Sequence, residues 1–350
     1  MSRFLSAALR DLEVYKPGEQ PGTRNLVKLN TNESPFPPAP GVKEAVREAA
    51  GTLQLYSDLS AASLIGLLAE TYDLEKNQIT VSNGSDEILA FAFQAFGEKG
   101  LLFPDITYGF YPVWAKLYQL DASIVPLDEE FSVNPQDYKD AQGRCVVLAN
   151  PNAPTGKALP LKDIEEIVKS NPDSVVIIDE AYVDFGGESA LTLIPRYDNL
   201  LVVRTFSKSR QLAGGRLGFA MGNALLIEDL NRVRYSFHPY NVNTLTQAAG
   251  AAALRQPDYF EACRQRIMET REWTRKELTA LGFRVLDSKA NFLFAAAPGM
   301  SGGEYQQKLR EKNVLIRYFD LPRIRDFTRI TIGSQTQMER LIEATKELIP

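Results

Sequence analysis

The residues best suited to chemistry lie in one stretch, residues 199–222 (NLLVVRTFSKSRQLAGGRLGFAMG). A short apolar run, typical of a buried strand, is followed at once by a polar turn with Thr205, Ser207 and Lys208. Arg216 comes eight residues after the lysine. A lysine amine can attack a carbonyl carbon, and partial burial lowers its pKa toward the useful range. Hydroxyl groups can donate to phosphate oxygens, and an arginine can bind a phosphate through two N–H groups.

These side chains together suit a cofactor that carries both an aldehyde and a phosphate, as pyridoxal phosphate (PLP) does. A basic surface loop would contain the same residue types, so this stretch alone leaves both interpretations open. A second candidate, Asp179, ends the apolar run 174–179 (SVVIID), and Tyr182 follows it by three residues. A buried carboxylate needs a partner, and a protonated pyridine nitrogen would supply one. The alternative for this pair is a capping aspartate and a core tyrosine.

The turn after the apolar run 78–81 is a further candidate for binding phosphate. Gly84 permits a tight turn, and Ser85 or Asp86 can cap the helix expected at 88–96. Free N–H groups and the positive end of the helix dipole favour an anion at such a junction. An ordinary capped helix would have the same sequence, so the motif does not decide the question alone.

All of these candidates follow strands in an alternation of strands and helices. Beyond those already given, we expect strands at 101–104, 123–126, 145–149, 200–203 and 217–220. The alternation predicts an α/β fold with a mostly parallel central sheet and helices on both faces, plus a smaller α+β domain. Functional groups in such sheets gather beyond the carboxyl ends of the strands, which is where the candidates fall.

The length of the chain indicates more than one domain. The 350 residues exceed what one hydrophobic core usually serves. We expect an N-terminal arm at 1–40, rich in proline, and a large α/β domain at 41–255. A smaller α+β domain should occupy 256–350, beginning with a long helix at 257–281.

Composition argues against several classes of protein. The net charge of −5 and the lack of a long basic run make nucleic acid and anionic membranes poor partners. Two distant cysteines exclude a disulfide framework and a cysteine zinc site, so we expect no metal. No apolar run reaches membrane-spanning length, and we therefore expect a cytoplasmic protein. His238 is the single histidine, which rules out a histidine-based triad and leaves lysine as the obvious group for proton transfer.

Several motifs resemble those of the fold type I PLP-dependent aminotransferases. They are IIDEAY (177–182), TFSK (205–208), GGR (214–216), NPNAPTG (150–156) and NGSDE (83–87). Four others are similar to bacterial histidinol-phosphate aminotransferases: YKPG (15–18), KLNTNESPFPPAP (28–40), YSD (56–58) and PYNVN (239–243). The resemblance covers almost the whole chain. It implies an exchange of the amino group between L-histidinol phosphate and 2-oxoglutarate in histidine biosynthesis, with PLP as cofactor.

The resemblance also implies a role for each matching residue. Lys208 would carry the cofactor and move a proton, Asp179 would pair with the pyridine nitrogen, and Tyr182 would bind the ring oxygen. Tyr108 would stack on the ring. The phosphate would be held by Gly84, Ser85, Asp86, Thr205, Ser207 and Arg216.

Further residues are implied in binding the substrate and a second subunit. Tyr56 would reach the cofactor phosphate of a neighbouring subunit, so we expect a homodimer with shared active sites. Tyr15 and Asn32 on the arm would contact the substrate. Arg317 and Arg329 would bind its anionic group, because paired guanidinium groups suit both carboxylate and phosphate.

The sequence departs from the family pattern at two places. Ala153 stands where the family has an asparagine before Pro-Thr-Gly. Either Asn152 replaces that asparagine at the ring oxygen or Tyr182 makes the contact alone. Arg210 and Gln211 make the turn after the lysine unusual.

Three other functions remain open on the same scaffold. An aromatic or broad-range aminotransferase and a threonine-phosphate decarboxylase would use the same cofactor, and the bond held perpendicular to the ring would decide between them. A non-catalytic PLP-binding regulator would carry a DNA-binding module ahead of this fold. We do not expect one, because no basic helix-turn-helix pattern precedes the arm.

Overall fold

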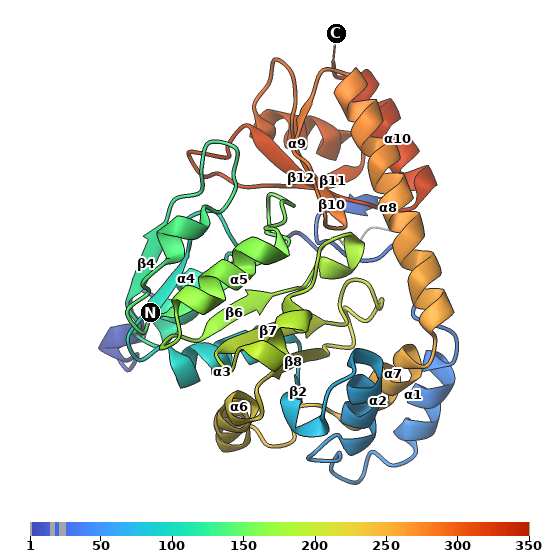
Figure 1. Ribbon diagram of the computed structural model, residues 1–350. Coiled ribbons are helices and arrows are strands. Elements are labelled where there is room, and N and C mark those ends of the chain that lie inside the picture. Colours follow the sequence, from blue (N-terminus) through green and yellow to red (C-terminus); the bar gives the residue numbers. More distant parts are fainter. Residues whose placement is uncertain (1, 15–17, 21–25, 350) are drawn as a thin grey trace.

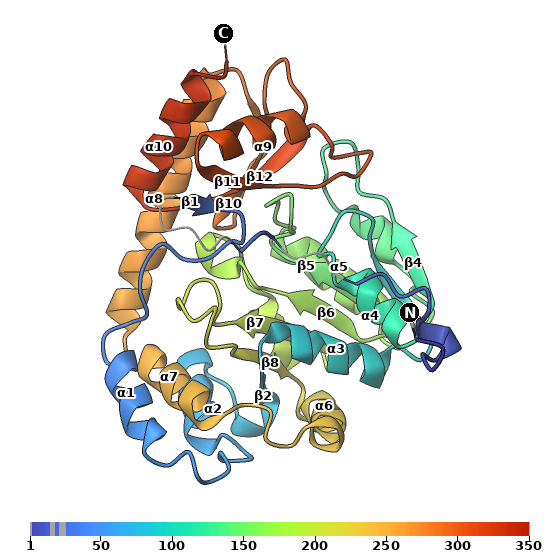
Figure 2. The ribbon, with the colours of Figure 1, turned by 180° about the vertical axis from the view of Figure 1, so that it is seen from behind.

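The computed structural model describes residues 2–14, 18–20 and 26–349, and in these residues the strands form two sheets (Figures 1 and 2). The larger sheet has seven strands in the order β2-β8-β7-β6-β5-β3-β4. Their bounds are β2 Ile79–Ser82, β3 Leu101–Pro104, β4 Ala122–Val125, β5 Cys145–Ala149, β6 Val176–Asp179, β7 Leu200–Thr205 and β8 Gly218–Gly222. The pairs from β4 to β7 are parallel, whereas β8 runs antiparallel to both β7 and β2. The expected mostly parallel α/β sheet is confirmed.

Helices cover both faces of this sheet because alternate strand residues point to opposite sides. Val146 and Leu148 of β5 belong to one apolar cluster, and Cys145 and Val147 belong to another. The first cluster takes in α2 (Ala62–Tyr72), α5 (Leu161–Ser170) and α7 (Thr244–Leu254). The second takes in α3 (Ser85–Phe96), α4 (Tyr111–Leu117) and α6 (Ala224–Phe237). The central strands of the sheet are therefore buried on both faces, as their nearly unbroken apolar sequences predict, whereas the edge strand β4 is partly exposed.

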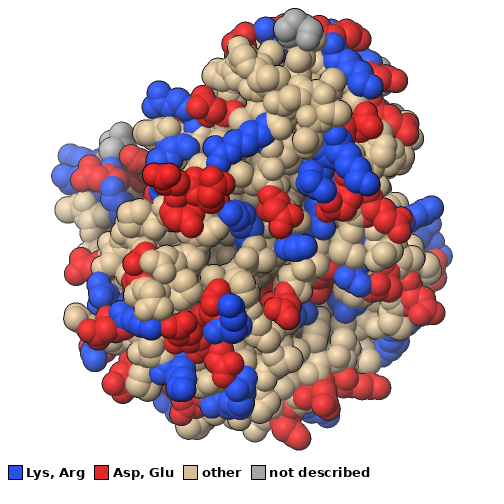
Figure 3. Space-filling view, turned by 45° about the horizontal axis from the view of Figure 1, so that its top comes forward, with Lys and Arg blue, Asp and Glu red and all other residues tan. Residues whose placement is uncertain are grey.

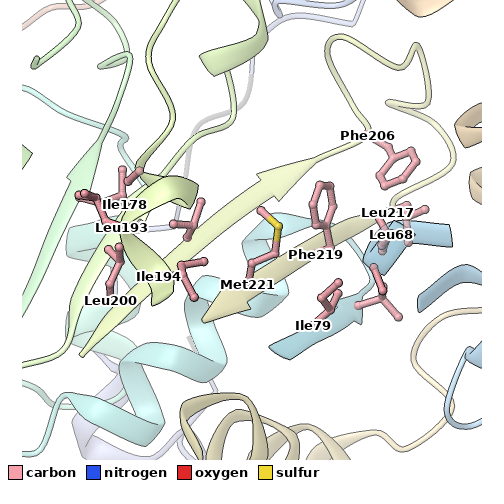
Figure 4. Packing of buried hydrophobic residues seen from close by; sticks show 14 of the residues in the cluster. Leu68, Ile79, Ile178, Leu193, Ile194, Leu200, Phe206, Leu217, Phe219 and Met221 are labelled. Carbon is pink, nitrogen blue, oxygen red and sulfur yellow. The ribbon is translucent and has the colours of Figure 1, made fainter. Parts of the chain in front are cut away.

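The first cluster also fixes the polar turn that follows β7. Phe206 is fully buried and meets Phe219 of β8 edge to face, with ring centroids 5.6 Å apart. Figure 4 shows Phe206 beside Leu217 and Phe219, while Leu193 and Ile194 pack further along the strands. Because Phe206 lies between Thr205 and Ser207, its burial anchors the turn at its middle.

The second sheet has five strands in the order β1-β11-β12-β10-β9. They are β1 Val27–Leu29, β9 Arg284–Val285, β10 Phe292–Ala296, β11 Val314–Tyr318 and β12 Phe327–Thr331. The strand β1 lies in the expected N-terminal arm, yet it pairs in parallel with β11. This part of the arm is thus an edge strand of the five-stranded sheet rather than an independent segment.

The remaining helices complete the layers around the two sheets. They are α1 (Val42–Ala50), α8 (Pro257–Ala280), α9 (Gly302–Glu311) and α10 (Gln335–Lys346), with short 3₁₀ turns at η1 Ala7–Leu9, η2 Lys76–Gln78, η3 Pro135–Tyr138, η4 Val183–Phe185 and η5 Ala190–Arg196. The long helix α8 runs along one side of the molecule from the seven-stranded sheet to the five-stranded sheet (Figure 1). The expected division at residues 255 and 256 falls immediately before it.

The surface and the helices bear on the other classes of protein that the composition argues against. Lys and Arg side chains are interspersed with Asp and Glu on the face shown in Figure 3, rather than gathered by sign. Within the described part of the chain, no helix is both long and apolar enough to cross a membrane. The same residues contain no group of three or more His, Cys, Asp or Glu side chains that could hold a metal ion.

Candidate active site

A cavity of about 380 Å³ lies between the two sheets and collects residues from distant parts of the chain. Twelve of the residues expected at a site line it: Asn32, Ser85, Asp86, Tyr108, Asp179, Tyr182, Thr205, Ser207, Lys208, Arg216, Arg317 and Arg329. Parallel strands explain part of this convergence. Ala149 at the end of β5 pairs with Asp179 at the end of β6, so both carboxyl ends open at one edge of the sheet.

Asp179 is buried at the floor of this cavity, with 5% of its surface exposed. Its carboxylate accepts hydrogen bonds from the Tyr111 hydroxyl at 2.9 Å and from the Ala181 N–H at 3.2 Å. Burial raises the pKa of Asp179 to about 6, and these two hydrogen bonds only partly counter the effect. A cationic group placed in the cavity would therefore stabilise the ionised carboxylate.

Lys208 reaches the same cavity from the turn after β7. Its Nζ lies 3.4 Å from the Thr31 carbonyl oxygen and 5.8 Å from the centre of the Tyr182 ring. The next residue, Ser209, donates to Asp184 Oδ2 at 2.5 Å. The amine is thus in a partly buried position, with the backbone on either side of it held by the buried Phe206 ring and by Ser209.

Tyr182 and Asn32 form the wall nearest the five-stranded sheet. Asn32 Nδ2 donates to the Tyr182 hydroxyl at 2.9 Å. The Asn32 side-chain oxygen accepts from Thr331 Oγ1 at 3.0 Å, and its carbonyl oxygen accepts from Asn291 Nδ2 at 3.0 Å. The segment after β1 is therefore fastened to β12 and delivers an amide group to the tyrosine oxygen. Sequence reasoning missed Thr331 and Asn291, since they are ordinary polar residues 299 and 259 positions away from Asn32.

The beginning of α3 forms a tight turn against Arg216. The N-cap of α3 is Gly84, at φ +89°, and no side chain caps the helix, so the expected cap at Ser85 or Asp86 is wrong. A Cβ on Gly84 would lie 2.6 Å from Arg216 Nη2, which explains the glycine. Asp86 accepts from Arg216 Nη2 at 3.2 Å and from the Tyr108 hydroxyl at 2.9 Å. The first N–H groups of the helix lack intrahelical acceptors and are suited to an anion.

The two hydroxyls after β7 lie close to this turn. Thr205 Oγ1 donates to Ser207 Oγ at 2.9 Å and accepts from the Ser207 N–H at 3.0 Å. Gly218 begins β8 opposite the turn, where a Cβ would meet the Ser85 nitrogen at 2.3 Å. Glycine is therefore required at both Gly84 and Gly218, where other segments come too close for a Cβ. The beginning of α3, the turn after β7 and Arg216 all contribute donors to one end of the cavity.

Two arginines occupy the opposite end of the cavity, on neighbouring strands of the five-stranded sheet. Arg317 of β11 pairs directly with Arg329 of β12. Arg329 donates to the Asn30 carbonyl oxygen at 3.1 Å and lies over the Phe292 ring at 5.5 Å. Arg317 lies over the Phe319 ring at 5.3 Å. The pair therefore presents two oriented guanidinium groups where a second anion could bind.

The structure does not bring every expected residue to the cavity. Asn152 donates to the Ile106 carbonyl oxygen and to Thr155 Oγ1, both at 3.0 Å, and it lines a separate cavity of about 170 Å³. Ala153 faces the main cavity instead. The idea that Asn152 replaces the missing asparagine is therefore wrong, because its amide is already engaged elsewhere. Gly84 does not line the cavity but underlies Arg216.

Two further expectations concern residues outside the cavity. Tyr56 is 83% exposed and stacks on Tyr240, with ring centroids 4.6 Å apart. It does not line the cavity of its own chain. Tyr15 lies outside the described residues, so its expected contact with substrate stays a prediction.

A buried ionic network behind the site was not predicted. Arg204 of β7 donates through Nε to Glu180 Oε2 at 2.9 Å and forms an ion pair with Asp184 at 3.4 Å. Both side chains of the Arg204–Glu180 pair are almost fully buried. Burial raises the pKa of Glu180, although Arg204 and Ser189 counter it. The sequence signalled this pair only through the position of its charges. Arg204 lies within the apolar strand β7, and Glu180 directly follows the apolar strand β6.

Packing explains the unusual residues Arg210 and Gln211 in the turn after the lysine. Arg210 is buried and lies over the Phe260 ring of α8 at 4.2 Å. Gln211 has φ +56° and donates to the Ser209 carbonyl oxygen. Neither residue lines the cavity, so the departure changes the support of the turn rather than its chemistry.

The chain is similar to known proteins over nearly its whole length. The family model for aminotransferase class I and II matches residues 24–344. Histidinol-phosphate aminotransferase 2 of Dechloromonas aromatica is 49% identical over 354 residues, covering 99% of each chain. Histidinol-phosphate aminotransferase 1 of Methylococcus capsulatus is 50% identical over 352 residues, covering 100% of this chain and 98% of that protein.

The fold is also similar to solved structures. A crystal structure of histidinol-phosphate aminotransferase from Sinorhizobium meliloti in complex with pyridoxal-5'-phosphate superposes with a TM-score of 0.88 at 23% identity. The superposition covers 100% of this chain and 98% of that chain.

Proposed function

The chain belongs to the class I and II aminotransferase family, and from this premise we propose that it is a PLP-dependent aminotransferase. Its proposed reaction exchanges the amino group between L-histidinol phosphate and 2-oxoglutarate, in histidine biosynthesis. The observation that carries the proposal is the joint placement of Lys208, the buried Asp179 and two anion-binding ends in one cavity. The choice of substrate is supported by curated relatives named histidinol-phosphate aminotransferases, whose sequences are 49% and 50% identical to this chain over nearly its full length.

The cavity fits the cofactor in the chemistry of its donors. The buried carboxylate of Asp179, with a pKa raised to about 6, matches a protonated pyridine nitrogen. The turn at Gly84, whose missing Cβ lets Arg216 approach, matches a phosphate group. When bound, PLP supplies an electron-withdrawing ring that stabilises negative charge at the α-carbon of the substrate.

The chain's own residues would then divide the remaining work. Lys208 would bond to the cofactor and afterwards hold and release a proton at its Nζ, since no histidine lines the cavity. Asp179 would keep the ring nitrogen protonated, because the attraction between them favours both charged forms. The Tyr182 hydroxyl, held by Asn32, would donate to the ring oxygen. Tyr108, which lines the cavity, would stack on the ring.

The two ends of the cavity would bind the two anions. The N–H groups of Ser85 and Asp86, the hydroxyls of Thr205 and Ser207, and Arg216 would hold the cofactor phosphate. Arg317 and Arg329 would bind the phosphate of one substrate and a carboxylate of the other, because a guanidinium fork matches both. The substrate would thereby be oriented with its amine toward Lys208.

We further propose that the active unit is a homodimer in which Tyr56 reaches the partner's cofactor phosphate. Large apolar side chains are exposed around Tyr56 on a face that we call the 53–240 face: Leu53, Leu55, Tyr56, Leu59, Tyr235, Phe237 and Tyr240. Exposed apolar groups of this kind mark protein interfaces. A cytoplasmic location is part of the same proposal and is supported by Cys145 and Cys263, which are buried and unbridged.

A half-reaction tests the proposed function. PLP-loaded protein is mixed separately with L-histidinol phosphate, L-phenylalanine and L-threonine phosphate, without a keto acid, and absorbance is followed. Rapid conversion to the pyridoxamine form by histidinol phosphate alone supports the proposal. Conversion mainly by phenylalanine would move the assignment to an aromatic aminotransferase. Release of carbon dioxide from threonine phosphate, without pyridoxamine, would indicate a decarboxylase.

A further inference from the structure

Apart from Tyr240 on the 53–240 face, the PYNVN segment (239–243) has no role in the function proposed above, yet the Asn241 side chain reaches the beginning of α3 at the cofactor end of the site. Asn241 is buried, and its Nδ2 donates to Glu87 Oε2 at 2.5 Å and to Ser82 Oγ at 2.7 Å. These partners flank the turn at 83–86 that begins α3. The segment between α6 and α7 is therefore joined to the N-terminus of α3.

Glu87 collects several donors beneath that turn. Its Oε2 also accepts from Ser82 Oγ at 2.6 Å and from the Asn83 N–H at 2.9 Å. One carboxylate oxygen thus joins the last residue of β2, the backbone of the turn and the Asn241 amide. Hydrogen bonds to an ionised carboxylate are among the stronger ones, so this arrangement restrains the direction of the Ser85 and Asp86 N–H groups.

The same segment also holds the opposite wall of the phosphate end. Thr246, in the first turn of α7, is buried and donates through Oγ1 to the Gly215 carbonyl oxygen at 2.7 Å. Asn243 caps α7 by accepting from the Thr246 N–H at 2.9 Å. Gly215 immediately precedes Arg216. Residues 241–246 therefore connect both walls between which a phosphate would bind.

We propose that Glu87, Asn241 and Thr246 are positioning residues that set the affinity of the site for the cofactor phosphate. The inference rests on the proposed function, since it concerns PLP. None of the three residues is among those lining the cavity in the described structure. They act on the donors through the Ser82–Asp86 turn and through Gly215, where their side-chain hydrogen bonds lie. Their loss should weaken binding of the phosphate while leaving binding of the ring unchanged.

Titrations of cofactor-free protein with PLP and with pyridoxal, which lacks the phosphate, test this inference. Asn241→Ala and Thr246→Val each remove one of the two connections. Each should weaken PLP binding about tenfold, the size expected when a hydrogen bond that orients a charged ligand is lost. Binding of pyridoxal should stay within about twofold of wild type. The inhibition constant of inorganic phosphate should also rise in both variants, by about the same factor as the dissociation constant of PLP.

Two further variants separate positioning from general destabilisation. Glu87→Gln keeps an acceptor oxygen and should bind PLP more tightly than Glu87→Ala. Asn199→Ala removes an amide that donates to three carbonyl oxygens at the other end of β7, so it should lower the melting temperature without changing the ratio of the PLP and pyridoxal affinities.

The outcomes distinguish this inference from the proposed function. A selective loss of PLP affinity in Asn241→Ala and Thr246→Val supports the positioning role. Equal losses for PLP and pyridoxal, or no loss, would overturn it while leaving the proposed function intact. Wild-type protein that takes up neither ligand would overturn the proposed function and this inference together.

Discussion

Replacing Asp179 by asparagine should stabilise the cofactor-free protein at neutral pH while it impairs the chemistry. The side chain is buried, and its two hydrogen-bond partners, Tyr111 and Ala181, are neutral donors. Neutral donors offset only part of the free energy needed to bury a negative charge. Asp86 and Glu180 nearby add repulsion. An asparagine of the same shape would carry no charge.

The size of the effect follows from the pKa of Asp179, which burial raises from 3.8 to about 6. Between these pH values the native state holds a proton that the unfolded state has lost. The free energy of unfolding therefore falls as pH rises through this window. The full loss amounts to about 3 kcal/mol, taking about 1.4 kcal/mol for each tenfold change in proton affinity. Asparagine does not titrate, so the variant escapes this loss.

Urea denaturation of cofactor-free wild type and Asp179→Asn measures the effect. The variant's free energy of unfolding, relative to wild type, should rise by about 2 kcal/mol between about pH 4 and about pH 7. Taking the difference between the proteins cancels the titration of groups that they share. Saturating PLP serves as the control, because a cationic partner should remove the advantage of the variant. A difference that does not change with pH, or that falls, would show that burial does not raise the pKa of Asp179.

Three other substitutions test the roles of Lys208, of the buried Arg204–Glu180 pair and of the 53–240 face. Lys208→Ala should slow the half-reaction by about 10²–10⁴-fold in stopped-flow absorbance, because proton transfer loses its group, while the melting temperature stays close to wild type. Arg204→Met should lower the free energy of unfolding by about 3–5 kcal/mol in guanidinium denaturation, because Glu180 would remain buried without its cation. Arg204→Lys should lose less. Phe237→Glu, on the 53–240 face, should shift the protein to monomer in light scattering, whereas Phe237→Leu should not.

The strands of the large sheet and its mostly parallel class could be predicted, because each strand leaves a local pattern in the sequence. Continuous apolar runs marked buried strands, and the structure has them within about two residues of the expected bounds. Asp179 ends one such run and Lys208 comes soon after the next. A parallel sheet therefore brings both residues to one edge. Neither inference needed knowledge of contacts between distant segments.

Other features depend on pairings that no local pattern encodes. The Asn32–Thr331 contact joins residues 299 positions apart, and the parallel pairing of β1 with β11 is set by the packing of the five-stranded sheet. Tyr111, the hydroxyl partner of Asp179, reads in the sequence as one more aromatic residue of a helix. The orientation of Asn152 followed from the local path of its turn, which directs the amide to Ile106.

The proposed function requires PLP to bind covalently at Lys208 and to accept an amino group there. Borohydride reduction of PLP-loaded protein, followed by digestion and mass spectrometry, tests this requirement. We expect a pyridoxyl group on the peptide that contains Lys208. We also expect prior incubation with L-histidinol phosphate, without a keto acid, to abolish this labelling, because the cofactor has then taken the amino group. A label on another lysine, or labelling that the amino substrate leaves unchanged, would rule out the proposed role of Lys208.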